Sequence, residues 1–371
     1  MICKPRFLAL IVAAALLICV GCGGHEFWTT QNSSNPTNPT GATPKFAFAA
    51  NFNSGGAGSI SAYTVNTSSG GLTAVANSPF LAGNATIAVG ADSAGKFVFA
   101  ANQAGGVSAY IISRTDGTLT AVSGSPFATG TTPAWVAVDP GGRFVSVVNA
   151  GSNDISGYTV NASTGVLTPL SSNAPLGGTP IRATVDPTGR FLYAALGTTG
   201  IGIYKINSDA TVTLVRTLAP SPCAAANDIA LDANTRFAFI ADGASAVCNY
   251  AVNASTGDLS LITSTAISAG TNPVGIAVGG NGKFLFAANQ GSGNVSGYTI
   301  NADGTLTAMS GSPFTAGTTP VAVTVDPSGM FLYVANFGSG TISIFTIGSS
   351  TLGSPVSVAA GTSPNSVVTT Q

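Results

Sequence analysis

The stretch from Gly130 to Gly177 reads GTTPAWVAVDPGGRFVSVVNAGSNDISGYTVNASTGVLTPLSSNAPLG, and closely related text recurs along the chain. A phenylalanine opens the second apolar run of every copy, in most of them just after a glycine-containing turn. These anchoring residues are Phe46, Phe97, Phe144, Phe191, Phe237, Phe284 and Phe331. Their spacing of 46 to 51 residues is typical of a repeat architecture, so the repeat decides the fold.

Each copy contains four short runs of alternating apolar residues, separated by Gly, Pro, Asn and Asp. Such runs predict strands joined by tight turns, and no helix is expected after residue 21. Four antiparallel strands per copy, repeated seven times, predict an all-β, seven-bladed β-propeller over residues 44–371.

The two ends of this region indicate how the ring closes. Residues Lys45–Asn51 match a second strand, with no first strand before them. The C-terminal text GTSPNSVVTTQ matches the first-strand pattern GTTPVAVTVDP, so residues Asn365–Thr370 are expected to supply the innermost strand of the first blade. Closing the ring in this way removes a free sheet edge.

The repeat text resembles the lactonase-type seven-bladed propellers, the 6-phosphogluconolactonase-like family. The resemblance rests on the following segments: Asp139–Phe144, Asp186–Phe191, Tyr158–Leu167, Tyr333–Asn336, Ser125–Gly130 and Ser312–Gly317. It covers about residues 44–371 and implies hydrolysis of a sugar lactone or similar cyclic ester. Family members are expected to place His, Glu and Arg at the mouth of the central channel.

The N-terminal residues predict export. Lys4 and Arg6 precede an apolar segment from Phe7 to Val20, which has the length of a signal-peptide core. Gly21-Cys22 resembles a bacterial lipobox, so residues 1–21 are a predicted lipoprotein signal peptide with lipidation at Cys22. The alternative is an ordinary secretory signal cleaved near Gly21 or Gly24. Residues 22–43 are predicted to be a flexible tether that anchors the protein in the cell envelope, at the outer membrane or the periplasmic face.

Composition excludes several functions. Only 7% of residues are charged, the net charge is −1, and no basic block is present, so nucleic acid is not an expected partner. The single His (His25) and single Glu (Glu26) lie in the predicted tether. In residues 44–371, GxSxG, HExxH, CxxC and calcium-loop patterns are absent, so neither a metal nor another cofactor is expected.

Most of the charged residues recur at the same positions in nearly every blade, where we expect them to stabilise turns. A few residues depart from the repeat and need another explanation. The second residue after the position that usually holds Pro in the first strand is small in most copies, but it is Trp135, Arg182 and Asp228 in three consecutive ones. Departures of a repeat from its own rule point to function or strain. We expect Asp228 to act as a catalytic base and Arg182 to stabilise an oxyanion, with Trp135 binding substrate.

Two further acidic residues are expected to bind substrate on the same face. Asp242 replaces the Asn that ends most second strands, and Asp154 lies in a nearby loop. Two alternatives stay open: Arg182 and Asp228 form a purely structural ion pair, or the propeller is a non-catalytic scaffold. The expected ligand is a small lactone or carbohydrate-like molecule, or else an envelope protein. The membrane is expected to be contacted only through the anchor, by a monomer.

Two cysteines remain in the repeat region, Cys223 in a linker between blades and Cys248 at the start of a third strand. Export and an even count predict a disulfide between them. The alternative is two separate buried thiols.

Overall fold

The structure is a computed structural model that describes residues 45–371 except 172, 220 and 280–281. The predicted signal peptide (1–21), the lipidation site Cys22 and the tether (22–43) lie outside the described residues. Within the described part of the chain, no helix is long and apolar enough to cross a membrane.

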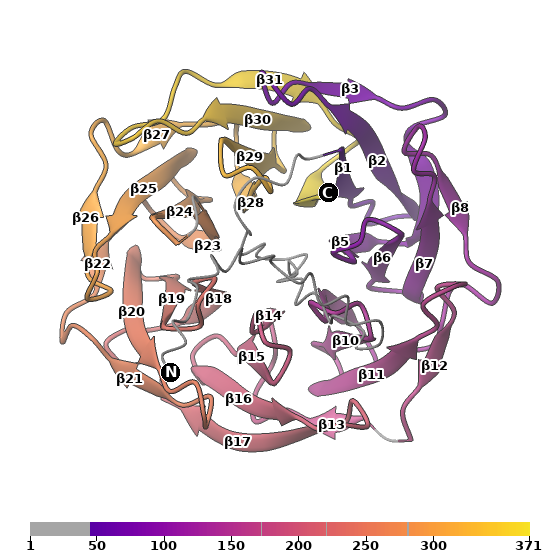
Figure 1. Cartoon of the computed structure of the whole chain (residues 1–371), viewed down its shortest axis with the longest axis horizontal. Helices are drawn as coiled ribbons and strands as arrows, with labels where there is room; N and C mark the ends of the chain where they lie inside the picture. Colours follow the sequence, from indigo (N-terminus) through magenta and orange to yellow (C-terminus); the bar gives the residue numbers. More distant parts are fainter. Residues whose placement is uncertain (1–44, 172, 220, 280–281) are drawn as a thin grey trace, which may run out of the picture.

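Seven antiparallel sheets stand around a central axis, so the predicted all-β, seven-bladed propeller is confirmed (Figure 1). Each blade has four strands, numbered here from the innermost outward. In several blades the fourth strand is split into two short pieces that pair with the same third strand, as β3 and β4 do with β2.

The blades are numbered in chain order, beginning with the one that contains both ends of the described chain. Blade 1 consists of β32 (Pro364–Thr369), β1 (Phe46–Asn51), β2 (Ala57–Val65), β3 (Leu72–Ala74) and β4 (Phe80–Asn84). Blade 2 consists of β5 (Thr86–Ala91), β6 (Phe97–Asn102), β7 (Gly106–Ile112) and β8 (Leu119–Ala121). Blade 3 consists of β9 (Pro133–Val138), β10 (Phe144–Asn149), β11 (Asp154–Val160), β12 (Leu167–Pro169) and β13 (Ala174–Pro175).

Blade 4 consists of β14 (Arg182–Val185), β15 (Phe191–Ala195), β16 (Ile201–Ile206) and β17 (Val212–Leu218). Blade 5 consists of β18 (Ala226–Leu231), β19 (Phe237–Asp242), β20 (Ala246–Val252), β21 (Leu259–Leu261) and β22 (Ile267–Ser268). Blade 6 consists of β23 (Pro273–Gly279), β24 (Phe284–Asn289), β25 (Asn294–Ile300), β26 (Leu306–Ala308) and β27 (Phe314–Thr315). Blade 7 consists of β28 (Pro320–Val325), β29 (Phe331–Asn336), β30 (Thr341–Thr346) and β31 (Val356–Ala359).

The ring closes through the C-terminal strand, as the sequence predicts. Strand β32 pairs with β1 in antiparallel register from Ala47↔Thr369 to Asn51↔Pro364. The backbone N–H of Lys45 donates to the carbonyl of Thr370 at 2.9 Å, so the described chain begins and ends at the same edge of blade 1.

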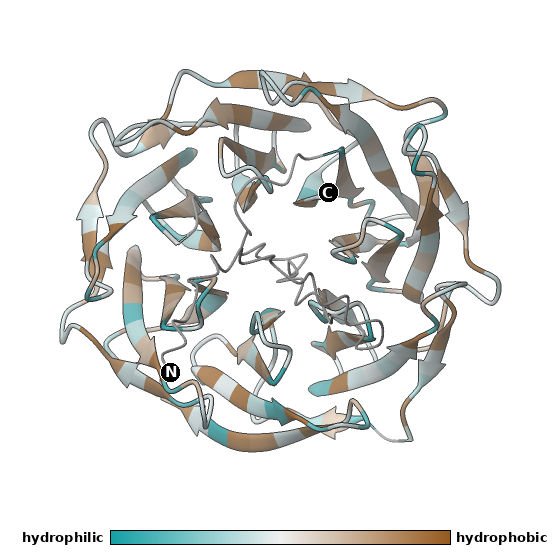
Figure 2. Cartoon of the chain, viewed as in Figure 1, coloured by the Kyte–Doolittle hydropathy of each residue, from teal (hydrophilic) through white to brown (hydrophobic). Residues whose placement is uncertain are grey.

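The core lies between neighbouring blades, because each sheet buries side chains on both of its faces. The second strands are buried along their length, and apolar bands run across the strands of every blade (Figure 2). Burial on both faces explains why these strands read as near-continuous apolar runs in the sequence. Apolar surface removed from water contributes about 25 cal/mol per Å² to stability.

Two faces of the propeller follow from the strand directions. The linkers between blades and the loops from second to third strand form one face, called here the loop face. The turns from first to second and from third to fourth strand form the other, the turn face. In blade 6, for example, Pro273 pairs with Asn289 at the loop face, and Phe284 pairs with Thr299 at the turn face.

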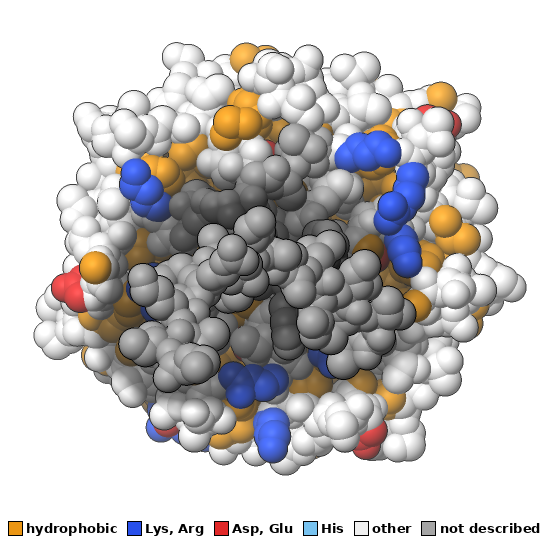
Figure 3. Space-filling view, viewed as in Figure 1, with side chains coloured by type: hydrophobic (Ala, Val, Ile, Leu, Met, Phe, Trp, Pro, Cys, Tyr) orange, Lys and Arg blue, Asp and Glu red, His pale blue; other side chains and the backbone are white. Residues whose placement is uncertain are grey.

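The recurring charges hold the turns of the turn face. The Asp92 carboxylate accepts the backbone N–H groups of Lys96 and Phe97, both at 2.7 Å. The basic residue before the anchoring Phe lies over its ring, as Arg236 does at 4.9 Å from the Phe237 centroid. Lys and Arg side chains are accordingly spaced around the face in view in Figure 3. These recurring charged residues therefore have a structural role and are not candidates for the functional site.

Candidate functional site

The three residues that depart from the small-residue rule lie at equivalent places in blades 3, 4 and 5. Trp135 pairs with Val148, Arg182 with Ala195 and Asp228 with Ala241, each near the loop-face end of an innermost strand. Because innermost strands surround the axis of the ring, side chains from these positions can meet at its centre (Figure 1).

The structure brings these three side chains together. Arg182 Nη1 lies 3.0 Å from Asp228 Oδ2, and the guanidinium carbon of Arg182 lies 4.5 Å from the centroid of the Trp135 ring. Their exposed fractions are 7% for Arg182, 5% for Asp228 and 3% for Trp135. The cation is therefore held by a buried carboxylate and an aromatic face, in surroundings where both contacts are strengthened by the loss of water.

Arg182 also reaches across the ring to blade 7. Its Nη2 donates a hydrogen bond to the carbonyl of Val321 at 2.6 Å. A Cβ placed on Gly275 would lie 3.1 Å from Arg182 Nη1 and 2.8 Å from that same carbonyl. The missing side chain at Gly275 therefore leaves room for the guanidinium. In the sequence, Gly275 is one of the small residues of the series, and its only signal is that it is the single glycine at this position.

Asp228 is held by backbone groups of two blades. Oδ1 accepts the N–H of Ile229 at 2.8 Å, and Oδ2 accepts the N–H of Ile276, in the next blade, at 3.0 Å. Ser366 does the same with its hydroxyl, which accepts the N–H of Val89 at 2.8 Å across the junction between blades 1 and 2. Asp228 therefore joins neighbouring blades as well as pairing with Arg182.

The environment of Asp228 changes its acidity. Burial raises the pKa of this carboxyl above its ordinary value of 3.8, while the Arg182 charge and the two backbone N–H groups act in the opposite direction. Desolvation is the largest of these effects. A carboxylate with a raised pKa beside a guanidinium can accept a proton from water and has a cation ready for a developing oxyanion.

Asp242 binds the linker that leads into its own blade. Its Oδ1 accepts the backbone N–H groups of Ala225 at 2.8 Å, Ala224 at 3.1 Å and Ala244 at 3.2 Å. In the regular blades the Asn at this position instead donates to a serine of the third strand, as Asn289 does to Ser296. The structure thus shows Asp242 holding a loop, and its role in substrate binding stays a prediction.

Asp154 is the first residue of β11, and not a loop residue as the sequence predicts, but it takes part in a hydrogen-bonded loop of blade 3. Its Oδ1 accepts hydrogen bonds from Asn149 Nδ2 at 2.7 Å and Ser152 Oγ at 2.8 Å, and its Oδ2 accepts one from Asn173 Nδ2 at 2.9 Å. Asn294 occupies the equivalent place in blade 6 and accepts the same bond from Asn289. These bonds tie Asp154 to its loop, so a contact with substrate stays a prediction here too.

The two cysteines of the repeat region are joined. The Cys223–Cys248 sulfurs lie 2.08 Å apart, with the Cα atoms separated by 6.1 Å, and both residues are buried. The Asp242 carboxylate lies within 4.8 Å of both sulfurs. Sulfurs in a disulfide do not offer the thiolates that a metal site would need, so this cluster fastens the linker of blade 5.

Comparison with known protein families gives one match that spans nearly the whole repeat region. The model of the family described as "Lactonase, 7-bladed beta-propeller" matches residues 29–313 and 298–369. A search of curated proteins gives no match.

Several solved structures share the fold at low sequence identity. A proposed 6-phosphogluconolactonase from Bacteroides fragilis is 20% identical with a TM-score of 0.73, covering 90% of this chain and 99% of that one. A similar protein from Bacteroides uniformis is 19% identical with a TM-score of 0.72, covering 88% and 100%. The periplasmic gluconolactonase of Pseudomonas aeruginosa is 18% identical with a TM-score of 0.70, covering 87% and 98%. At these identities the likeness shows the fold alone.

Proposed function

The chain belongs to the lactonase family of seven-bladed β-propellers, and from this premise we propose that it hydrolyses a sugar lactone or similar cyclic ester at the mouth of the central channel. The observation that carries the proposal is the Asp228 carboxylate, whose burial raises its pKa and which lies 3.0 Å from the Arg182 guanidinium. The gluconolactonase among the structural relatives suggests the class of substrate.

In the proposed reaction, Asp228 acts as a general base and then as a general acid. It takes a proton from a water molecule, whose oxygen attacks the lactone carbonyl carbon. The resulting oxyanion is stabilised by N–H groups of Arg182, which has five donors and spends one on Asp228 and one on Val321. The ring C–O bond then breaks, the leaving oxygen takes the proton from Asp228, and an open-chain hydroxy acid leaves.

The composition of the repeat region favours an aspartate base. Residues 45–371 contain no His and no Glu, so the His and Glu expected in the family's channel mouth are not available here. An ordinary Asp is a weak base near neutral pH, and burial corrects this by raising the pKa of Asp228. Trp135 supplies an apolar wall against which the carbon skeleton of the substrate packs. We assign Asp154 and Asp242 to substrate binding at the rim of the mouth.

A panel of sugar and aliphatic lactones tests this proposal. Each of Arg182→Ala and Asp228→Asn is expected to lower kcat/KM about a hundredfold or more. Asp303→Asn is the matched control, because Asp303 is exposed in a turn of the turn face and Asn keeps a carbonyl oxygen for Thr305. Full activity in both site variants would place the reaction elsewhere on the propeller.

A second candidate is a non-catalytic propeller that binds a carbohydrate-like ligand or an envelope protein. It is favoured by two observations: Trp135, Arg182 and Asp228 bury one another, and the loop face carries polar clefts. One cleft of about 570 Å³ is lined by Gln290–Gly293, Ala316–Thr319 and the hydroxyls of Ser339, Thr341 and Ser357. Saturable binding of an oligosaccharide without turnover of any lactone would select this candidate.

We further propose export and lipidation at Cys22, with the propeller held in the cell envelope as a monomer. Lys45, the first described residue, lies at the turn face, where its backbone N–H donates to the carbonyl of Thr370. Arg182 lies near the opposite, loop face, so we propose that the tether joins the propeller on the side away from Arg182. Labelling with a radioactive fatty acid is expected to disappear in Cys22→Ser, and labelling that persists would contradict lipidation.

A further inference from the structure

Blade 3 lacks an aromatic ring that every other blade has in its second strand. The third residue of that strand is Phe48, Phe99, Tyr193, Phe239, Phe286 or Tyr333 in the other six blades. In blade 3 it is Ser146, which is buried. A buried serine in a position that otherwise holds an aromatic ring removes most of the volume of the side chain.

A second large side chain is missing beside it. In each blade, the fifth residue of the second strand lies opposite one residue of the third strand. That third-strand residue pairs, on its outer side, with one further residue of the same blade. This outer residue is large in six blades: Phe80, Phe127, Leu218, Ile267, Phe314 and Val358. In blade 3 the pair is Ile155↔Ala174, so an alanine stands where three of the other blades have a phenylalanine.

Blade 6 shows which space the two missing rings would fill. A Cβ placed on Gly297 of its third strand would lie 3.1 Å from Phe314 and 3.5 Å from Phe286, so both rings lie over this glycine. The equivalent glycine of blade 3 is Gly157. A Cβ there would meet Leu170, but no atom of residues 146 or 174 is among its nearest neighbours.

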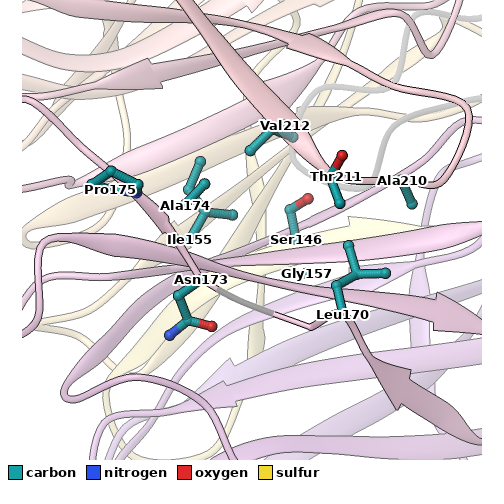
Figure 4. Close-up of a pocket in the computed structure, with 10 residues that line it drawn as sticks. All are labelled: Ser146, Ile155, Gly157, Leu170, Asn173, Ala174, Pro175, Ala210, Thr211 and Val212. Atoms are coloured by element: carbon teal, nitrogen blue, oxygen red, sulfur yellow. The ribbon is translucent and has the colours of Figure 1, made fainter.

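The space is open in blade 3. A cavity of about 200 Å³ lies between blades 3 and 4, and its lining includes Ser146, Gly157 and Ala174. Figure 4 shows Leu170 extending toward the cavity from blade 3, whereas the amide of Asn173 points away from it. On the side of blade 4 lie Val212, the first residue of β17, and Ala210 and Thr211 in the turn before it.

We propose that this cavity binds a small neutral aromatic molecule of the phenol class, whose ring takes the place of the two missing side chains. An apolar cavity of about 150 Å³ is large enough to bind benzene, so the volume here suffices for one six-membered ring. Ile155, Leu170 and Val212 supply apolar contact to the ring. Ser146 supplies a buried polar group for one hydroxyl, and none of the described lining residues is charged, which favours a neutral ligand.

The proposal does not depend on lactone hydrolysis. The cavity lies between the second, third and fourth strands of the blades, away from the innermost strands that carry Arg182 and Asp228. Binding at one site and catalysis at the other are therefore separate questions that separate variants can answer.

Calorimetric titration of the full purified chain with phenol tests the proposal. We expect saturable binding of one phenol per chain, with a Kd of about 0.1–1 mM, which is the range open to so small a ligand. Ala174→Phe restores a side chain that the repeat uses elsewhere, and it is expected to weaken binding at least tenfold while leaving the melting temperature equal or higher. Ser146→Phe is a second, independent way to fill the cavity and is expected to act in the same direction.

Phe286→Ser/Phe314→Ala is the matched double variant in blade 6. It removes both rings, opens the equivalent space there and is expected to add a second phenol site. Absence of saturable binding to the unaltered chain would overturn the proposal, and so would unchanged binding in Ala174→Phe and Ser146→Phe. Failure of both filling variants to fold would also overturn it, because the space would then not be shaped for a ring.

Discussion

Blades 3 and 6 share their strand order, their turns and much of their sequence, yet they fill the space around the third strand differently. Blade 6 packs Phe286 and Phe314 over Gly297, whereas blade 3 has Ser146 and Ala174 and a cavity of about 200 Å³. The backbone is maintained in both, because hydrogen-bonded ladders and turn residues form it without the rings. The repeat therefore determines the backbone fold of each blade, and a single blade can have smaller core side chains without changing that fold.

The same contrast holds for larger regions of the ring. One position near the loop-face end of each innermost strand holds Trp135, Arg182 and Asp228 in blades 3 to 5. The other four blades have small residues there: Ala88, Gly275, Ala322 and Ser366. In blade 5, moreover, Asp242 and the Cys223–Cys248 disulfide replace the Asn–Ser hydrogen bond of the regular blades. Departures from the repeat are therefore concentrated in consecutive blades, on one side of the ring.

The largest expected effect comes from exchanging the residues of blades 3 and 6. Phe286→Ser gives blade 6 the serine of blade 3, and it is expected to cost about 5 kcal/mol of unfolding free energy, because it opens a cavity and buries a hydroxyl. Ser146→Phe fills a space that already exists and is expected to be neutral or stabilising. Urea denaturation followed by circular dichroism measures both. Equal losses in the two variants would show that blade 3 is as closely packed as blade 6.

The next effect compares a buried arginine with an exposed one. Arg182→Ala leaves the Asp228 carboxylate buried without its partner and is expected to cost about 3–5 kcal/mol. Arg236→Ala removes a half-exposed partner of Asp232 and is expected to cost less than about 1 kcal/mol. The double variant Arg182→Ala/Asp228→Ala should recover part of the first loss. If both arginines cost the same, Arg182 is an ordinary surface charge and not a buried one.

The disulfide gives a smaller effect, confined to blade 5. Its loop runs from Cys223 to Cys248, a sequence separation of 25 residues, and closing a loop of this size stabilises a chain by about 3 kcal/mol. A reductant is expected to lower the urea midpoint of the unaltered chain and to leave Cys223→Ser/Cys248→Ser unchanged. A midpoint that is insensitive to reductant in both proteins would mean that the bridge does not form in solution.

The fold could be predicted from the sequence because the pattern of strands and turns occurs in seven similar copies. The anchoring Phe residues indicate the number of blades, and the C-terminal match to a first strand identifies how β32 closes the ring. Periodicity of this kind carries information about local structure and about neighbours that lie one repeat apart.

Less of the candidate site could be predicted, because its contacts cross several blades. Arg182 stands out by its departure from the repeat, but its bond to the Val321 carbonyl, three blades away, depends on the length of the side chain and the width of the ring. Ser146 and Ala174 break the repeat just as clearly as Arg182 does. Their importance could not be seen in the sequence, because a cavity appears only when the positions of the neighbouring side chains are known.

The pH dependence of kcat/KM for a hydrolysed lactone tests the central proposal most directly, since it follows the proton on Asp228. The base must be ionised to act, and burial raises its pKa, so the rate is expected to fall with decreasing pH along an acid limb whose midpoint lies above 3.8. Asp228→Asn is expected to lose both the rate and this limb. A limb at or below the ordinary Asp value, or one that survives in Asp228→Asn, would contradict the assignment of Asp228 as the base.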